Sequence, residues 1–141
     1  MDGEESSIFT RIINGELPCH KVYEDELVFA FLDINPMSPC HTLVVPKEPA
    51  VTLDALSEEY AEAIGRVLPK ISRAVLQVSG ASEFNVLQNN GANAYQSVFH
   101  VHFHIIPKFD DGRGLAWPMS TMPITDEEGS RMASQIRAIL G

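Results

Sequence analysis

Five short segments of the chain carry hydrophobic residues in patterns typical of β-strands. Segments 20–25, 27–33 and 41–46 are rich in Val, Phe and Tyr, and turn formers such as the stretch "NPMSP" separate them. Segments 83–88 and 97–107 alternate hydrophobic and polar residues at period two, and the polar stretch "NNGANAYQ" joins them. We therefore expect a five-stranded, mostly antiparallel sheet in which the first three strands are adjacent.

Three other segments repeat hydrophobic residues at spacings of three and four, which is typical of helices. The first has its hydrophobic positions within residues 8–13 and is terminated by Gly15. The second covers 57–80, and the third follows Thr125. Pro69 lies inside the long segment and removes one backbone hydrogen bond, so we expect a kink there. The pattern predicts an α+β fold, with one long helix and one or two shorter ones packed against the sheet.

Length and composition fit one globular domain. The chain has 141 residues, of which 45% are hydrophobic and 21% charged. The acidic start "MDGEESS" carries no helix or strand pattern. We expect a flexible N-terminus at residues 1–7 and a single domain over residues 8–141.

Charge and cysteine content exclude several classes of partner and location. A net charge of −9 opposes binding to polymeric nucleic acid, whose phosphates attract Lys and Arg. No apolar run approaches the roughly 20 residues that cross a bilayer, and the start does not resemble a signal peptide. The two cysteines, Cys19 and Cys40, form no CxxC pair and are expected to be reduced thiols. We expect a protein of the cytosol that can also diffuse into the nucleus.

The segment "SVFHVHFHIIPKFD", residues 97–110, places three histidines at every second position: His100, His102 and His104. In a regular strand, residues two apart share one face at a spacing of about 6.6 to 6.8 Å. We expect the three rings to point the same way. The intervening residues are expected to form a buried apolar face: Val101, Phe103 and Ile105.

Three interpretations of this row of histidines are open on the residues alone. A metal site is disfavoured because the outer two rings would lie about 13 Å apart along a strand, and no CxxC or HExxH accompanies them. A structural role, with each ring satisfied by a hydrogen bond, is more typical of a lone histidine. We favour catalysis on a phosphoryl group, in which neighbouring imidazoles keep an attacking ring neutral. No metal and no other cofactor is expected.

The alternation from His100 to Ile106, together with "FAFLDINP", "HTLVVPK", "NVLQNNG" and "QSVFH" in this order, resembles the histidine triad (HIT) superfamily. The resemblance runs from about Ile8 to Trp117. The sequence "AWP" after the histidines is similar to the Hint branch, the purine nucleoside phosphoramidases. The resemblance implies a HIT-like fold and a homodimer built around the main helix and an edge strand.

The resemblance also implies a two-step reaction. His102 would attack the α-phosphorus of a purine nucleoside phosphoramidate and form a nucleotidyl-histidine, which water then hydrolyses. Ser97 would help deliver a proton to the leaving nitrogen. His104 and His41 would serve the proton relay and the phosphate, and His100 would orient the nucleophile.

The remaining positions implied by the resemblance form a nucleotide pocket. Asp33 would accept hydrogen bonds from the ribose hydroxyls, or else is a turn residue opening "DINP". Asn89 would contact the phosphate or leaving group, or else stabilises the "NNG" turn. Six residues would enclose the base, and two more complete the substrate-binding set: Ile8, Phe9, Ile12, Phe31, Ile34, Leu43, with Gln96 and Val98.

The sequence departs from the family pattern at several positions. Ser7, Thr10 and Pro49 stand where many relatives carry the ligands of a structural zinc, so no such site is expected. Tyr95 precedes the Gln where a glycine is common, which leaves the substrate preference open. His20 matches no family position and is expected at the surface.

Two alternative functions remain. One is hydrolysis of dinucleoside polyphosphates by the same nucleophile, although the Trp-Pro sequence and the few basic residues near the histidines, Lys108 and Arg113, speak against it. The other is a nucleotide-binding interaction module with incidental activity. In each case the expected small-molecule partner is a purine nucleotide.

Overall fold

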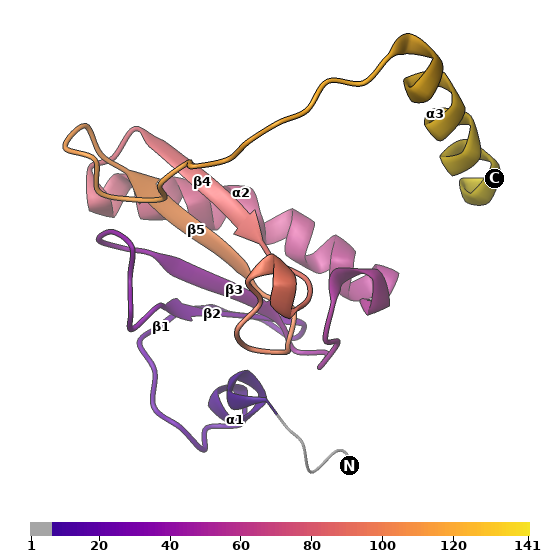
Figure 1. The fold of residues 1–141 in the computed structure, drawn as a ribbon. Coiled ribbons are helices and arrows are strands. Elements are labelled where there is room, and N and C mark those ends of the chain that lie inside the picture. Colours follow the sequence, from indigo (N-terminus) through magenta and orange to yellow (C-terminus); the bar gives the residue numbers. More distant parts are fainter. Residues whose placement is uncertain (1–6) are drawn as a thin grey trace.

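Five strands form one antiparallel sheet in the order β1-β2-β3-β5-β4 (Figure 1). The computed structural model describes residues 7–141. The expected five-stranded sheet is confirmed, as is the adjacency of its first three strands. The strands are β1 (Lys21–Glu24), β2 (Val28–Leu32), β3 (Thr42–Pro46), β4 (Glu83–Gln88) and β5 (Phe103–Lys108).

The helices are α1 (Ile8–Ile13), α2 (Glu58–Ser79) and α3 (Asp126–Leu140), with short 3-10 turns at Leu53–Ala55 and Ala92–Ala94. All three α-helices were expected from the periodicity. α2 continues through Pro69, and the kink expected there stays a prediction.

Residues at the helix ends explain where each helix begins and stops. Gly80 ends α2 in the left-handed conformation at φ 79°, which glycine adopts without steric cost. Thr125 begins α3 through a capping box with Glu128, in which each side chain bonds the other residue's backbone N–H. Ser57 occupies the N-cap of α2, but its hydroxyl makes no capping hydrogen bond.

Both faces of the sheet are covered, each by a different helix. We call them the α2 face and the α1 face. On the α2 face, Val28 and Ala30 of β2 pack with Ile64 and Val67 of α2. On the α1 face, the alternate β2 residues join Phe9 of α1 in a second cluster: Phe9, Phe29, Phe31, Leu43 and Val45.

β5 is shorter than the sequence pattern predicts. The strand was expected over residues 97–107, but it begins at Phe103, so His100 and His102 precede it in an irregular segment. The expectation of one strand carrying all three histidines is therefore wrong. Val101 and Ile105 of the expected apolar face are buried, but Phe103 is only partly buried. His100 and His102, at the alternate positions, are buried as well.

α3 stands apart from the sheet at the end of an extended segment (Figure 1). None of its residues is buried, and Ile139 of its apolar side is 87% exposed. Within residues 7–141, no helix combines the length and apolar character that crossing a membrane requires.

Residues 1–6 lie outside the described part of the chain, and they make up most of the N-terminus expected to be flexible. Ser7, the last residue of that stretch, is the N-cap of α1.

Candidate active site

The pairing of β5 places His104 on the α1 face. His104 lies opposite Leu43 of β3, and residues directly opposite each other in a sheet point to the same side. Leu43 belongs to the α1-face cluster. His104 therefore faces the layer that contains α1.

His102 lies beside His104 and against α1. The ring centroids of His102 and His104 are 4.9 Å apart, and those of His102 and Phe9 are 5.0 Å apart, both in edge-to-face geometry. His102 is only 4% exposed. The sheet and α1 thus hold this ring in a defined place.

A backbone carbonyl fixes the tautomer of His102. Its Nδ1 lies 2.7 Å from the carbonyl oxygen of His100, and a carbonyl can only accept a hydrogen bond. Nδ1 therefore carries the proton in the neutral ring. The lone pair is left on Nε2, the atom that would act as a nucleophile.

His100 is held from both sides of its ring. Its Nε2 donates to the Pro46 carbonyl at 2.8 Å, and its Nδ1 lies 2.9 Å from Ser7 Oγ and 3.4 Å from Thr10 Oγ1. The ring is fully buried. Both ring nitrogens thus have hydrogen-bond partners within the protein, and these bonds hold the segment in place.

A chain of hydrogen bonds fixes the tautomers of His41 and His104. The Met37 backbone N–H donates to His41 Nδ1 at 3.0 Å, so the neutral ring of His41 carries its proton on Nε2. That Nε2 lies 2.9 Å from His104 Nδ1 and donates to it. His104 therefore carries its own proton on Nε2, where it can donate to a ligand.

Burial keeps the four rings neutral. It is the main cause that lowers the pKa of His41, His100 and His102 from 6.5, and it lowers the pKa of His104 to about 4, with further contributions from His102 and His41. We expected neighbouring imidazoles to keep His102 neutral. For that ring the cause is burial instead, and neighbouring rings contribute at His100 and His104.

Asp33 follows β2, and its two carboxylate oxygens have different partners. Oδ1 accepts the Asn35 backbone N–H at 2.8 Å, which is the turn role considered from the sequence. Oδ2 lies 3.5 Å from His41 Nε2 and is otherwise available. The turn role and a ligand-binding role are therefore compatible.

Asp33, His41 and His104 form the cluster best placed to hold a metal ion among the described residues, with donor atoms within 4.8 Å of one another. Two imidazoles and a carboxylate are a known ligand set. The Met37 N–H, however, forces the proton of neutral His41 onto Nε2, the atom that would have to bind the metal. This donor set fits a proton relay better than a metal site.

An apolar layer lies next to the histidines on the α1 face. Phe9 and Phe31 meet edge to face with centroids 5.4 Å apart, and Ile12, Leu43 and Val98 pack in the same cluster. Two further residues expected in this pocket, Ile8 and Ile34, are 50% and 79% exposed and belong to neither buried cluster.

Two other expected site residues, Gln96 and Ser97, lie in the loop before the histidines and differ in burial. Gln96 is buried, and its side-chain amide bonds Gly91, Val51 and Val98, so it stabilises the loop. Ser97 is exposed, and its hydroxyl has no hydrogen-bond partner within the described chain.

Asn89 and Tyr95 lie in the same loop. Asn89 donates to the Tyr95 carbonyl at 3.5 Å, a weak contact consistent with the turn role. Tyr95 is 87% exposed and has a positive φ of 69°. His20 is exposed, as expected.

Sequence reasoning missed four groups that orient the histidines: the Met37 N–H, the Pro46 carbonyl and the hydroxyls of Ser7 and Thr10. The backbone groups carry no residue-type signal. Ser7 and His100 are 93 positions apart, so no local pattern connects them.

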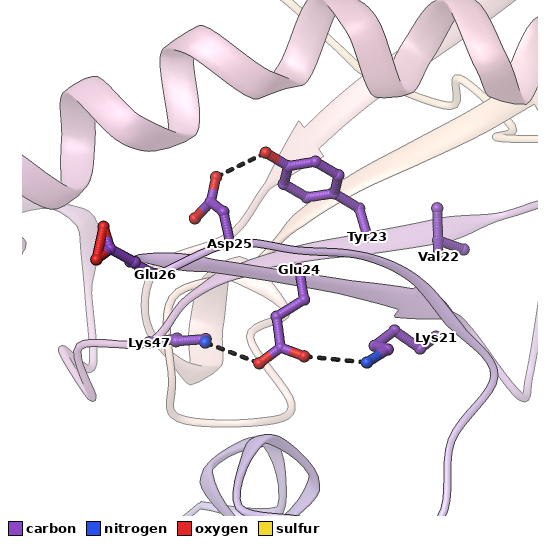
Figure 2. Close-up of a pocket in the computed structure, with 7 residues that line it drawn as sticks. All are labelled: Lys21, Val22, Tyr23, Glu24, Asp25, Glu26 and Lys47. Carbon is purple, nitrogen blue, oxygen red and sulfur yellow. Dashed lines mark hydrogen bonds and ion pairs between the residues drawn. The ribbon is translucent and has the colours of Figure 1, made fainter.

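A separate open hollow of about 600 Å³ lies at the turn between β1 and β2 (Figure 2). Figure 2 shows Glu24 between Lys21 and Lys47, at 3.1 and 2.8 Å, and Tyr23 donating to Asp25 at 2.7 Å. These charged groups satisfy one another. The hollow contains none of the histidines and is not part of the candidate site.

The sequence and the fold are similar to those of known proteins. The HIT domain family matches residues 14–111, a range that includes the four histidines and Asp33 but not Ser7 or Thr10. Adenosine 5'-monophosphoramidase hnt1 of Schizosaccharomyces pombe is 44% identical over 138 residues, covering 94% of this chain and 99% of that protein. Adenylylsulfatase HINT3 of Arabidopsis thaliana is 37% identical over 95% of this chain and 69% of that protein. The crystal structure of a histidine triad nucleotide-binding protein from Candida albicans superposes with a TM-score of 0.86 at 34% identity, covering 96% of this chain and 97% of that one. The chain belongs to the HIT family.

Proposed function

We propose that the chain is a purine nucleoside phosphoramidase of the Hint type. It would hydrolyse the P–N bond of a nucleoside 5'-phosphoramidate, such as an AMP amide or AMP-lysine, or act on an aminoacyl-adenylate. The products would be a nucleoside monophosphate and the released group. The observation that carries this proposal is the set of tautomers: His102 keeps a lone pair on Nε2, and neighbouring His104 keeps a proton on its own Nε2.

In the first step, His102 Nε2 forms a bond to the α-phosphorus and the P–N bond breaks. As the bond forms, the His102 ring becomes cationic, and the His100 carbonyl at 2.7 Å from Nδ1 stabilises that charge. His104 donates its Nε2–H to a phosphoryl oxygen. Ser97 hydrogen-bonds the leaving nitrogen and helps deliver the proton that lets it depart as a neutral amine.

In the second step, water attacks the phosphorus of the nucleotidyl-histidine and breaks the P–N bond to His102. The water oxygen stays on the nucleoside monophosphate, the proton that the water loses replaces the one delivered to the leaving amine, and Nε2 regains its lone pair. His41 keeps His104 in the donating tautomer through both steps.

The nucleotide would lie on the α1 face. Asp33 would accept the ribose hydroxyls through Oδ2, because Oδ1 is already bonded to the Asn35 N–H. Exposed Ile8 and Ile34 would contact the base, and the buried cluster around Phe9 and Phe31 would support them. We assign Asn89 to the leaving-group side and Gln96 to the support of the loop that carries Ser97.

Rapid mixing with an adenosine 5'-phosphoramidate, followed by intact-mass measurement, tests this function. We expect the wild type to gain one adenylyl group and release AMP, and His102→Ala to do neither. A wild type that hydrolyses only a dinucleoside polyphosphate would favour that alternative activity. Tight AMP binding by both proteins without turnover would favour a binding module.

We also propose a homodimer formed through α2 and β4. β4 is at the edge of the sheet and, among the described strands, pairs with β5 alone, so its outer edge is available for pairing. A groove of about 420 Å³ follows α2 and β4 and is lined by Leu68, Pro69, Ser72, Arg73, Leu76, Phe84 and Val86.

Size-exclusion chromatography with light-scattering detection tests the dimer. We expect a dimer for the wild type and a monomer for Val86→Lys, because Val86 is half-exposed in the groove. Val78→Lys, at an exposed position of α2 outside the lining, is the control and should remain dimeric. A monomeric wild type would contradict the proposal.

The proposed partner is a purine nucleotide and not a nucleic acid polymer, given the net charge of −9. The proposed location is the cytosol, which two unpaired cysteines support.

A further inference from the structure

The first turn of α1 reaches the histidines through two hydroxyl groups. Ser7 Oγ lies 2.9 Å from His100 Nδ1, and Thr10 Oγ1 lies 3.4 Å from the same nitrogen and 3.3 Å from Ser7 Oγ. The Thr10 backbone N–H donates to Ser7 Oγ at 3.0 Å. Ser7 therefore begins the helix and contacts His100 with one side chain.

The direction of the hydrogen bond to His100 is determined by its other nitrogen. Nε2 must donate to the Pro46 carbonyl, so Nδ1 of the neutral ring is an acceptor. The hydroxyl at 2.9 Å therefore donates to Nδ1. Without a hydroxyl, this fully buried ring nitrogen would lose its partner.

The backbone of His100 has no support from strand pairing. Its carbonyl, which orients His102, belongs to the irregular segment before β5. The same peptide unit is held at its N–H end, where Val101 donates to the Ala50 carbonyl at 2.8 Å. The other constraint on its position is the His100 side chain, held between Pro46 and Ser7.

We propose that the Ser7 and Thr10 hydroxyls are positioning residues for the nucleophile, acting through the His100 side chain and carbonyl on the His102 ring. The inference rests on the proposed function, because it assumes that His102 is the nucleophile. Both hydroxyls lie outside residues 14–111, the range that matches the HIT family.

The contribution should be larger in the transition state than in the substrate complex. The hydrogen bond from His102 Nδ1 to the His100 carbonyl strengthens only as His102 becomes cationic. An error in the carbonyl position therefore lowers kcat and leaves KM nearly unchanged. If α1 served only to bind the nucleotide, for example through Phe9, its variants would raise KM instead.

Steady-state and single-turnover kinetics with an adenosine 5'-phosphoramidate test the proposal on the full chain. For Ser7→Ala we expect kcat and the rate of His102 adenylylation to fall about tenfold, with KM changed less than about twofold. Ser7→Thr keeps a hydroxyl and should retain kcat within about threefold. Thr10→Val should lower kcat by roughly two- to fivefold, since its hydroxyl is the more distant one.

Arg11→Ala is the matched control in the same helix. Arg11 is exposed, and its ion-pair partner among residues 7–141 is Glu16 at 3.6 Å, so its replacement should leave both kinetic constants unchanged. Unchanged kcat in Ser7→Ala, or an effect on KM alone, would overturn the proposal. Equal losses in Ser7→Ala and Ser7→Thr would overturn it too, because the hydroxyl would then not be the active feature.

Nitrogen NMR of the imidazole rings provides a readout that needs no turnover. In the wild type we expect the proton on Nε2 of His100 and on Nδ1 of His102, and in Ser7→Ala a shift of the His100 Nδ1 resonance. A wild-type His100 protonated on Nδ1 would overturn the proposal even if Ser7→Ala did not fold. A wild type with the expected tautomers but no turnover of any purine phosphoramidate would instead contradict the proposed function.

Discussion

The two faces of the sheet are built from alternate residues of the same strands, yet they carry different chemistry. The buried members of the α2-face cluster are all aliphatic, including Val28, Val44 and Ile105. The α1 face carries Phe29 and Phe31 from the next positions, and beside them lie the histidines. The difference indicates that the α2 face mainly stabilises the fold and the α1 face mainly forms the site. Substitutions on each side can test this division.

The largest expected effect is on the α1 face. His102→Asn removes the proposed nucleophile, while its side-chain amide can still donate to the His100 carbonyl. We expect kcat/KM to fall by roughly 10⁴-fold or more. The melting temperature should change much less than for a truncation on the α2 face. A variant that kept a few per cent of the activity would place the nucleophile elsewhere.

The converse effect is expected on the α2 face. Ile64→Ala removes a side chain that is 2% exposed in α2 and should lower the free energy of unfolding by about 2–5 kcal/mol. Well below the melting temperature, kcat should stay unchanged, because Ile64 belongs to the cluster on the opposite face of the sheet from His104. Urea unfolding and turnover measured on the same sample check both statements.

Val78→Ala is the control for Ile64→Ala. Val78 lies in the same helix and is 78% exposed, so its truncation should change stability by less than about 0.5 kcal/mol. A loss of kcat in Ile64→Ala at full folding would show that the two faces are coupled.

The pH dependence of stability should separate the two faces as well. The folded pKa of His104 is about 4, below the ordinary 6.5, through burial and the neighbouring His102 and His41, with Asp33 opposing the shift. Between about pH 6.5 and 4 the unfolded chain therefore binds more protons than the folded one. The free energy of unfolding should fall as the pH drops through this window. His41, His100 and His102 have pKa values shifted in the same direction.

Urea unfolding at pH 7, 6 and 5 measures this loss, and His104→Gln should reduce it by removing one titrating group. Carboxylates contribute at lower pH. Hydrogen bonds from Lys47 and Lys21 lower the pKa of Glu24; at Asp25 burial opposes the shift, but hydrogen bonds together outweigh it and lower the pKa. Both give stability that is lost as the pH falls below about 4. A stability that did not change between pH 7 and 5 would contradict neutral, buried histidines.

Much of the fold was predictable because its signals are local. Hydrophobic periodicity predicted each strand and helix, and Gly80 and Thr125 marked helix ends as expected. Periodicity could not show that β5 begins only at Phe103, because a row of alternating residues looks the same whether or not a neighbouring strand pairs with it. Nor could a local pattern show that α3 would remain unpacked while α1 packs against the histidines.

The types of site residues were predictable, but their bonding was not. The resemblance named His41, His102, His104 and Asp33, which the structure brings together around one point. The tautomer of His41 depends on the Met37 N–H, which is only four positions away but is a backbone group without a residue-type signal. The hydrogen bonds of His100 come from Pro46 and Ser7, 54 and 93 positions away in the sequence. Such contacts arise only from the tertiary fold.

The smallest expected effect concerns backbone strain. Two non-glycine residues have positive φ in the described chain: Cys40, directly before His41, and Tyr95, before Gln96. The end of α2, by contrast, meets the same requirement with Gly80, at φ 79°. Left-handed geometry is costly for residues with a Cβ, and strained positions are often associated with functional sites.

Tyr95→Gly and Gly80→Ala should therefore change stability in opposite directions. Tyr95 is 87% exposed, so Tyr95→Gly loses little contact, and relief of the strain should raise the free energy of unfolding by about 0.5–1 kcal/mol. Gly80→Ala introduces a Cβ that meets no atom within 4 Å, so only strain acts, and it should lower stability by about 1 kcal/mol. Tyr95→Ala keeps the strain and removes the ring, and it should leave stability nearly unchanged. If Tyr95→Ala were as stabilising as Tyr95→Gly, the tyrosine ring and not the backbone would be the source of the cost. If Tyr95→Gly stabilised the protein but slowed turnover, the strain would be retained for the reaction, in the loop that carries Ser97 and leads to the histidines of the α1 face.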